Sequence, residues 1–392
     1  GAPHAPASAS RPPLPAARRA VMPRPEAWRL AVALAAVALG IHAARPRRQW
    51  IGLAVGGKAP VSKFFAEIDN AMQRLKVRDL GTDRCETLAL NMTSEDPGTR
   101  AALVHTGIDA KTREAADVER KWRLGALSFL VTQAPSARMI IWVEPPLADA
   151  ANRTLEPVFR LDRTKRIALK QFDATREFNA AFPGDQARAD SLAESYGRNW
   201  KPASKSDLSR SVLLHNYGGM WIDTDVVLLR SLAPVVGVDF AYLGQDDFIN
   251  NAVLGTSGPR SPFMRAYLDV IEAEIKSMAG QHPNGRAADA SIYAFGPESL
   301  KRLWQQSRSN STMHVLLGCF FDGGWVPGDR AVPWDAFFTG NATEKQVQYF
   351  TPGSGIHGTF AYHWHGRWDQ PIARQSTAAR FEAMCMHALR AT

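Results

Sequence analysis

The sequence predicts an α/β protein with a mostly parallel central sheet flanked by helices. Short apolar runs rich in β-branched and aromatic residues alternate with longer helical stretches from residue 101 onwards, as in a parallel sheet with crossover helices. Of the 392 residues, 45% are hydrophobic and 11 are tryptophan, which is ample for a large core. We find no internal repeat.

The elements are expected in a definite order. Strands are predicted over residues 101–108, 138–144 and 166–172, a helix over 115–132, and helical stretches before residue 206. A helix from Ser206 then ends at Gly218-Gly219, and a hydrophobic strand runs into Asp223 and Asp225. Further strands are predicted over 252–256 and 359–364, and further helices over 262–278, 298–307 and 378–389.

The first hundred residues differ from the rest in composition. Residues 1–29 form a basic tail rich in Pro, Ala and Arg that is expected to be disordered, and residues 30–44 form an apolar run. At about 1.5 Å per residue the run spans roughly 22 Å, short of the ~30 Å hydrocarbon core. It is therefore a short signal-anchor, a signal-peptide core or a buried helix. Residues 45–100 make a stem or packing region, and residues 101–392 a single domain.

Charge and cysteine usage narrow the class of protein. The net charge of +9 is concentrated in residues 1–50, which carry +7 and leave the body nearly neutral, without the basic stripe of a nucleic-acid binder. Three widely spaced cysteines fit no zinc or catalytic pattern and allow at most one disulfide. Four N-x-S/T sequons are compatible with a secretory-pathway lumen: Asn91, Asn152, Asn310 and Asn341.

The aspartate pair Asp223 and Asp225 is the most informative feature. In extended backbone, carboxylates at i and i+2 project to one side, so these two are expected to lie side by side on the same face of the strand. Burying two unpaired carboxylates costs several kcal/mol, and a divalent cation removes that cost. A hard cation with open positions also holds a diphosphate, so the pair predicts a metal–diphosphate site.

The helix before the pair supplies further candidates. Ser206 and Asp207 are good helix-start residues, and Asp207 and Arg210 share a face at i and i+3. This is either a surface salt bridge or a pair that points into a sugar pocket, with Arg210 orienting Asp207. The buried side of the helix is expected to consist of Leu208, Val212, Leu213 and Tyr217.

The residues between helix and aspartates have assigned roles as well. Gly218 suits the left-handed position that ends a helix, and Gly219 lets backbone or ligand approach closely. Trp221 either stacks on a nucleotide base or ribose or packs in the core. Asp225 is expected to bind the metal directly, and Asp223 to bind ribose or sugar hydroxyls and the metal, directly or through water.

The run S-D-x-x-R-x-x-x-L-x-x-x-G-G-x-W-x-D-x-D resembles the DxD sugar-binding region of glycosyltransferases. These include the α-1,4-galactosyltransferases, the initiating α-1,6-mannosyltransferases and the glucosyltransferase domains of large clostridial toxins. Further similarities lie at Asn251-Ala252, where the family places an Asn near sugar and acceptor, at Gly296-Pro297, at a helix start, and loosely at Val332-Pro333-Trp334. Aligning Gly366 and Trp368 with the family's late His/Trp segment selects His363 over His365 as a metal ligand.

The resemblance implies a GT-A-like fold in which residues 101–392 are the catalytic domain. It implies Mn²⁺ (or Mg²⁺) and transfer of a hexose, with retention, from a nucleotide-diphosphate sugar, with UDP-sugar favoured, to a glycan or glycolipid. Asp223 and Asp225 are then the catalytic pair, and Asp207, Arg210 and Asn251 bind substrate. The expected location is the Golgi membrane with a lumenal catalytic domain, or the secreted state.

Two other functions are compatible with the pair. Asp223-Thr224-Asp225 after a hydrophobic strand also fits the start of a haloacid-dehalogenase-type phosphatase, with a nucleophile and a general acid. That function leaves Asp207, Arg210 and Gly218-Gly219 unexplained, and Asp246-Asp247 follows too soon to be its later acidic pair. The other possibility is a catalytically inactive, lumenal glycan-binding relative.

Overall fold

The computed structural model describes residues 102–108, 117–198, 200–244, 248–281, 291, 293–306, 313–322, 333–352 and 359–391. The predicted basic tail, apolar run and stem (residues 1–100) lie outside these residues, as do Asn91, Asn310, Asp246, Asp247 and Val332. Within the described residues, none of the helices combines the length and apolarity needed to cross a membrane.

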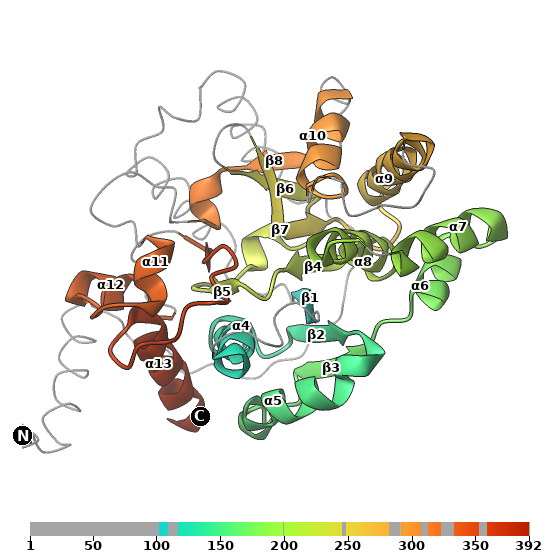
Figure 1. The fold of residues 1–392 in the computed structure, drawn as a ribbon. Coiled ribbons are helices and arrows are strands. Elements are labelled where there is room, and N and C mark those ends of the chain that lie inside the picture. The colour runs from blue at the N-terminus through green and yellow to red at the C-terminus, as the bar shows by residue number, and fades with distance from the viewer. Residues whose placement is uncertain are drawn as a thin grey trace, which may run out of the picture. The chain divides into compact units, whose positions relative to one another are not determined.

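A seven-stranded sheet in the order β3-β2-β1-β4-β7-β6-β8 forms the centre of the domain (Figure 1). β1, β2, β3 and β4 are mutually parallel, β7 runs antiparallel to β4 and β6, and β8 is parallel to β6. This confirms the predicted α/β class with a mostly parallel sheet. The strands are β1 (Leu103–Ile108), β2 (Arg138–Val143), β3 (Ile167–Gln171), β4 (Gly219–Ile222), β6 (Phe240–Leu243), β7 (Ile249–Thr256) and β8 (His314–Leu316).

Helices cover both faces of this sheet (Figure 1). On one face lie α4 (Val118–Thr132), α5 (Ala148–Leu161), α11 (Trp334–Phe338), α12 (Glu344–Tyr349) and α13 (Thr377–Ala391). The other face is covered by α6 (Ala174–Ala181), α7 (Gln186–Gly197), α8 (Pro202–Tyr217), α9 (Pro262–Gln281) and α10 (Pro297–Gln306). The helices predicted within the described residues are present, and α5, α11 and α12 were not foreseen.

Each face has its own hydrophobic core, and β4 contributes to both. Met220 and Ile222 lie in the core beneath α4 and α13, whereas Trp221 lies in the core beneath α8 and α9. Alternation along an extended strand sends neighbouring side chains to opposite faces, so β4 is buried on both sides. Core packing on both faces of the sheet therefore holds the strand that leads into the aspartates.

Helix α8 begins four residues earlier than the sequence predicts. Its first residue is Pro202, which has the fixed φ that suits this position, and the side chain of its N-cap residue Lys201 does not cap the helix. The prediction that Ser206 and Asp207 start the helix is therefore wrong, and Asp207 lies inside it. The expected buried side is correct for Leu208, Val212 and Leu213 but wrong for Tyr217, which is 37% exposed.

The Gly218-Gly219 pair joins α8 to β4 at two close contacts. Both glycines have positive φ, 70° and 85°. A Cβ on Gly219 would lie 2.4 Å from the carbonyl oxygen of Leu103, and one on Gly218 would lie 2.7 Å from the amide nitrogen of Pro259. The close approach that these glycines permit is therefore that of the chain's own backbone.

The aspartates do not lie on an extended strand, which corrects the sequence argument. β4 ends at Ile222, residues 223–225 form a turn in which the Val226 amide donates to the Asp223 carbonyl at 3.1 Å, and β5 (Val226–Leu228) follows. β5 pairs antiparallel with β9 (Ala361–His363), with Val226 opposite His363. The turn thus brings the aspartates next to a histidine 138 residues away in sequence.

Candidate active site

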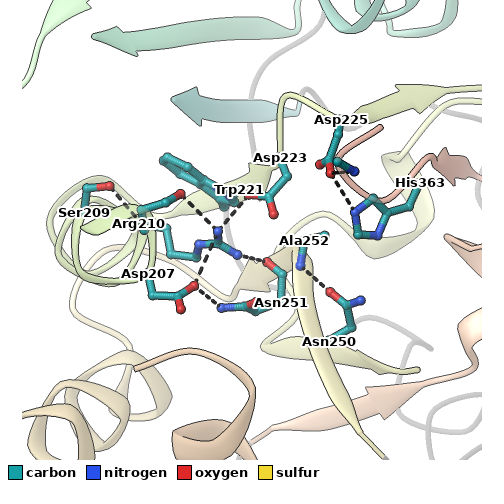
Figure 2. Close-up of polar contacts among 12 residues, drawn as sticks. Asp207, Ser209, Arg210, Trp221, Asp223, Asp225, Asn250, Asn251, Ala252 and His363 are labelled. Carbon is teal, nitrogen blue, oxygen red and sulfur yellow. Dashed lines mark hydrogen bonds and ion pairs between the residues drawn. The ribbon is translucent and has the colours of Figure 1, made fainter. Parts of the chain in front are cut away.

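Arg210 links the residues around the first aspartate. Its guanidinium lies 2.8 Å from Asp223 Oδ1 and 3.4 Å from Asp207 Oδ1, and it donates to the carbonyl oxygen of Asn251 at 2.6 Å (Figure 2). The side chain is only 4% exposed and stands over the ring of Trp221, 5.3 Å from its centroid. The predicted Asp207–Arg210 pair therefore exists, and it is a buried ion pair rather than a surface salt bridge.

The carboxylate of Asp207 is buried in a tightly packed part of the site. The Asn251 side-chain amide donates to its Oδ1 at 2.8 Å, and a Cβ on Gly296 would lie 2.5 Å from its Oδ2. Burial raises the pKa of Asp207 to about 6, although Arg210 and Asn251 oppose the shift. The site therefore holds a carboxylate in an environment that favours its protonated form.

This pKa predicts how stability depends on pH. Between about pH 4 and 6 the folded state binds more protons than the unfolded state, so the free energy of unfolding falls as pH rises through this window, by roughly 3 kcal/mol. Asp207→Asn cannot ionise. Relative to wild type its stability should therefore rise between about pH 4 and pH 6 and stay level at higher pH, while its activity is lost. Thermal melts of both proteins across this range measure the difference, and a difference that stays constant with pH would contradict the assignment.

Asp223 and Asp225 each use one oxygen for protein contacts. Asp223 Oδ1 accepts from the Trp221 indole N–H at 2.6 Å as well as contacting Arg210. Asp225 Oδ2 accepts from the Gly366 amide at 2.7 Å and lies 3.2 Å from His363 Nε2. Within the described part of the chain, the other oxygen of each carboxylate has no hydrogen-bond partner. Two carboxylate oxygens on one turn are thus available to a ligand.

The charges around this turn are strongly coupled. Burial and the neighbouring Asp225 raise the pKa of Asp223 against the effect of Arg210. Burial also acts to raise the pKa of Asp225, but His363 outweighs it and the pKa is lowered. Burial acts to lower the pKa of His363, but Asp225 outweighs it and raises that pKa to about 9. Asp225 is therefore ionised at neutral pH and His363 carries the compensating charge.

Lys121 fixes the segment that carries the Gly366 amide. Its ammonium, on α4, donates to the carbonyl oxygens of Arg367 and Trp368 at 2.7 and 2.8 Å and to that of Gln370. The side chain is fully buried, and burial lowers its pKa to about 8. α4 is thereby tied to the loop that completes the contacts of Asp225.

The donor set fits a divalent cation. Asp225 and His363 lie together, and Asp322, His363 and His365 form a group whose ligand atoms lie within 4.8 Å of one another. Oδ1 of Asp322 is buried and has no partner among the described residues. Carboxylates with imidazoles suit a first-row transition metal such as Mn²⁺, and the carboxylates alone suit Mg²⁺.

A cavity of roughly 140 Å³ opens at the carboxyl ends of β1 and β2, beside the start of α8. It shares Trp221 with the site, and the hydroxyl of Tyr196 in its wall donates to Glu144 at 3.0 Å. Ligands of parallel sheets gather at this edge. The remaining lining residues are Gly107, Trp142, Val143, Phe172, Trp200, Pro202, Lys205, Ser206 and Ser209.

The structure groups most of the predicted site residues in two adjoining clusters. Asp207, Arg210, Trp221, Asp223 and Asn251 form the first cluster, and Asp225 with His363 the second (Figure 2). Gly218 and Gly219, which were predicted to contact substrate, instead connect α8 to β4. Trp221 is 1% exposed, and its indole N–H holds Asp223.

Sequence reasoning missed Asp322, Lys121 and the cavity. Of these features, only the cavity could have been recognised from the sequence. Trp142, which lines it, is an aromatic residue at the carboxyl end of a predicted parallel strand, where ligands bind.

Comparison with known protein families gives a match that covers the aspartate pair. Residues 126–245 match the family described as "Glycosyltransferase sugar-binding region containing DXD motif". None of the curated proteins compared with the chain matches it.

Similar solved structures include mouse xyloside xylosyltransferase 1 in its apo form, at 13% identity over 70% of this chain and 99% of that one, with a TM-score of 0.38. The PaToxG glycosyltransferase is 14% identical over 58% of this chain and 79% of that one, with a TM-score of 0.36. An active-site mutant of LgtC is 14% identical over 73% of this chain and 95% of that one, with a TM-score of 0.35. At these TM-scores the likenesses say nothing about substrate. The family match, however, spans α8, β4 and both aspartates, so residues 126–245 form a glycosyltransferase sugar-binding region of the DXD-containing type.

Proposed function

We propose that this protein transfers a hexose from a nucleotide-diphosphate sugar, with a UDP-sugar favoured, to a glycan or glycolipid acceptor, with retention of configuration. One observation carries the proposal: the turn at residues 223–225 presents two carboxylates, each with one oxygen uncommitted among the described residues, beside a buried arginine and a buried histidine. Retention and the preference for UDP follow from the resemblance to the family.

A divalent cation, Mn²⁺ or Mg²⁺, would be held by Asp225 and His363, with Asp223 as a direct or water-mediated ligand. When bound, it supplies positive charge to the departing diphosphate. Arg210 keeps Asp223 in place through its 2.8 Å contact, which stops the two aspartates from separating as their charges repel. Gly366 holds Asp225 from the other side through its amide.

Asp207 and Asn251 are assigned to the sugar. Their side chains are hydrogen-bonded to each other and both residues contact Arg210, so they present one preorganised polar surface. Hydroxyl groups of a sugar can replace or extend such bonds, and a buried arrangement discriminates strongly against a donor that leaves them unpaired. The identity of the hexose is decided here.

The aromatic cavity is assigned to the nucleoside. Trp142 and Trp200 line it, and Glu144 adds an acceptor that Tyr196 already orients. A planar base stacks on such rings while its N–H groups donate to the carboxylate. The cavity adjoins Trp221, so a nucleoside there has its diphosphate directed toward the aspartates.

Donor hydrolysis tests the proposed activity. The full chain is incubated with a panel of UDP- and GDP-sugars in Mn²⁺, Mg²⁺ or EDTA, and the released nucleoside diphosphate is measured. We expect hydrolysis of a UDP-hexose with Mn²⁺ and none with EDTA. Inactivity toward every donor in every condition would count against catalysis. Release of inorganic phosphate from small phosphate esters instead would favour the phosphatase.

We further propose a lumenal location, anchored in the Golgi membrane through the N-terminal segment. The apolar run supports this, and the described sequon residues Asn152 and Asn341 are exposed and open to glycosylation. A shift in gel mobility on treatment of cell-expressed protein with an N-glycosidase is expected. An unmodified protein would contradict lumenal residence.

A further inference from the structure

The start of α4 is joined to the segment at residues 367–372 through main-chain atoms. The ammonium of Lys121 donates to three carbonyl oxygens of this segment, at 2.7 and 2.8 Å for the first two. The amide of Ile372 donates to Oδ2 of Asp117, the N-cap residue of the helix, at 2.6 Å. The three donors of the ammonium are thus all used on one short stretch of chain.

Packing alone does not explain a lysine at this position. The side chain of Lys121 is fully buried, and its ammonium lies 4.5 Å from the ring centroid of Phe338 and 5.7 Å from that of Trp364. Burying a charge is unfavourable unless hydrogen bonds compensate it, and an apolar side chain would fill the same space without that cost. What the ammonium adds is its bonds to the three carbonyl groups, which fix where the segment lies.

The residue just before this segment holds Asp225. The amide of Gly366 donates to Asp225 Oδ2 at 2.7 Å. Gly366 and the preceding His365 have positive φ, 64° and 52°. A left-handed conformation costs free energy at a residue with a Cβ, so this turn persists because the chain on both sides of it is held. The pairing of β9 with β5 holds the chain before the turn, and Lys121 holds the chain after it.

The same face of α4 also holds β5, which directly follows the aspartate turn. The hydroxyl oxygen of Ser128 accepts from the amide of Leu228 at 2.9 Å. A Cβ on Gly125 would lie 3.2 Å from the carbonyl oxygen of Val226, so helix and strand are in close contact there. Lys121, Gly125 and Ser128 stand at i, i+4 and i+7, which places them on one side of the helix.

We propose that α4 positions Asp225 for the cation from both sides, with Lys121 as the positioning residue that holds the Gly366 amide against this carboxylate. The inference rests on the proposed metal-dependent function. Lys121 acts through the Gly366 amide rather than on the carboxylate directly. Gly125 and Ser128 fix the strand that follows the aspartate, so one helix sets the separation of the two segments that meet at Asp225.

Binding of Mn²⁺ alone to the full chain tests this without any turnover. Electron paramagnetic resonance measures the affinity in Lys121→Met, in which the side chain keeps its length and loses its donors. The matched control is Arg166→Met, because Arg166 is also a buried cation that donates to three carbonyl oxygens, at the opposite end of α4. Both variants should melt at a lower temperature than wild type. Only Lys121→Met should weaken Mn²⁺ binding, by about 10- to 100-fold.

The results separate this inference from the proposed function. Full Mn²⁺ affinity in Lys121→Met, with loss of affinity in Asp225→Asn, would overturn the role of Lys121 and leave the metal-dependent function standing. Equal losses in Lys121→Met and Arg166→Met would also overturn it, because general loosening of the fold would then explain both. The expected Mn²⁺ affinities without hydrolysis of any donor would support the inference and contradict the proposed activity.

A second variant covers the case in which Lys121→Met does not fold. Gly125→Ala is expected to fold, because alanine favours a helix more than glycine does. Its new Cβ, 3.2 Å from the Val226 carbonyl oxygen, should displace β5 by a few tenths of an ångström. Mn²⁺ binding should then weaken by about tenfold. Wild-type affinity in this variant would show that α4 does not position the aspartate, and would overturn the inference.

Discussion

Replacing Asp225 with asparagine is expected to lower kcat/KM for donor turnover by about 1,000-fold, because several kcal/mol of charge stabilisation depend on the cation that this carboxylate holds. Asparagine keeps the shape, and its oxygen still accepts from the Gly366 amide. His363, whose pKa is raised to about 9 chiefly by Asp225, then loses its counter-charge and gives up its proton. The fold is expected to survive at a lower melting temperature.

Steady-state kinetics with the preferred donor, at several Mn²⁺ concentrations, measures this loss. Asp190→Asn is the control, since this aspartate is exposed on α7 and accepts a hydrogen bond from the Gln186 side chain, on its own helix. It should match wild type in kcat, KM and Mn²⁺ dependence. If Asp225→Asn keeps a tenth or more of wild-type turnover with unchanged metal dependence, Asp225 does not hold the cation.

Gly296→Ala is expected to reduce activity by about 100-fold although it adds a single methyl group. The new Cβ would lie 2.5 Å from Asp207 Oδ2 and 2.6 Å from Asn251 Nδ2, so both side chains must move. They are 3% and 5% exposed, which leaves no free space to take up the shift. Overpacking of this kind should also cost about 1–3 kcal/mol of stability.

The matched substitution is Gly197→Ala at the end of α7, where an added Cβ meets nothing within 4 Å. Kinetics and thermal melts of the two variants are compared side by side. Gly197→Ala should leave both quantities near wild type. Normal turnover in Gly296→Ala would show that the Asp207–Asn251 pair is not part of the working site.

The sequence predicts well what depends on local chemistry. Alternation of apolar residues gives the strands, and the spacing of Asp207, Arg210, Asp223 and Asp225 gives the site, because these features lie within twenty residues of one another. Its errors are also local. The extended-strand argument placed the carboxylates on one side, whereas they lie together because a turn and the pairing of β5 with β9 put them there.

Long-range contacts account for what the sequence could not show. Asp322 follows a hydrophobic segment without a recognisable motif. Its importance to the site is visible only in its contacts with His363 and His365, which lie more than forty residues later in the sequence. The same is true of Lys121, whose three carbonyl partners begin 246 residues downstream. The start of α8 was missed because Ser206, a common helix-start residue, lies four residues inside a helix whose first residue is Pro202.

Binding of UDP with and without a metal ion tests the central claim most directly. Calorimetric titration of UDP into the full chain is carried out with Mn²⁺ and again after removal of metal with EDTA. Because the aspartate pair would otherwise repel the diphosphate, we expect Mn²⁺ to strengthen binding by at least about tenfold in wild type and to have no such effect in Asp225→Asn. Equal affinity in Mn²⁺ and in EDTA would contradict a site in which Asp223 and Asp225 hold a diphosphate through a cation.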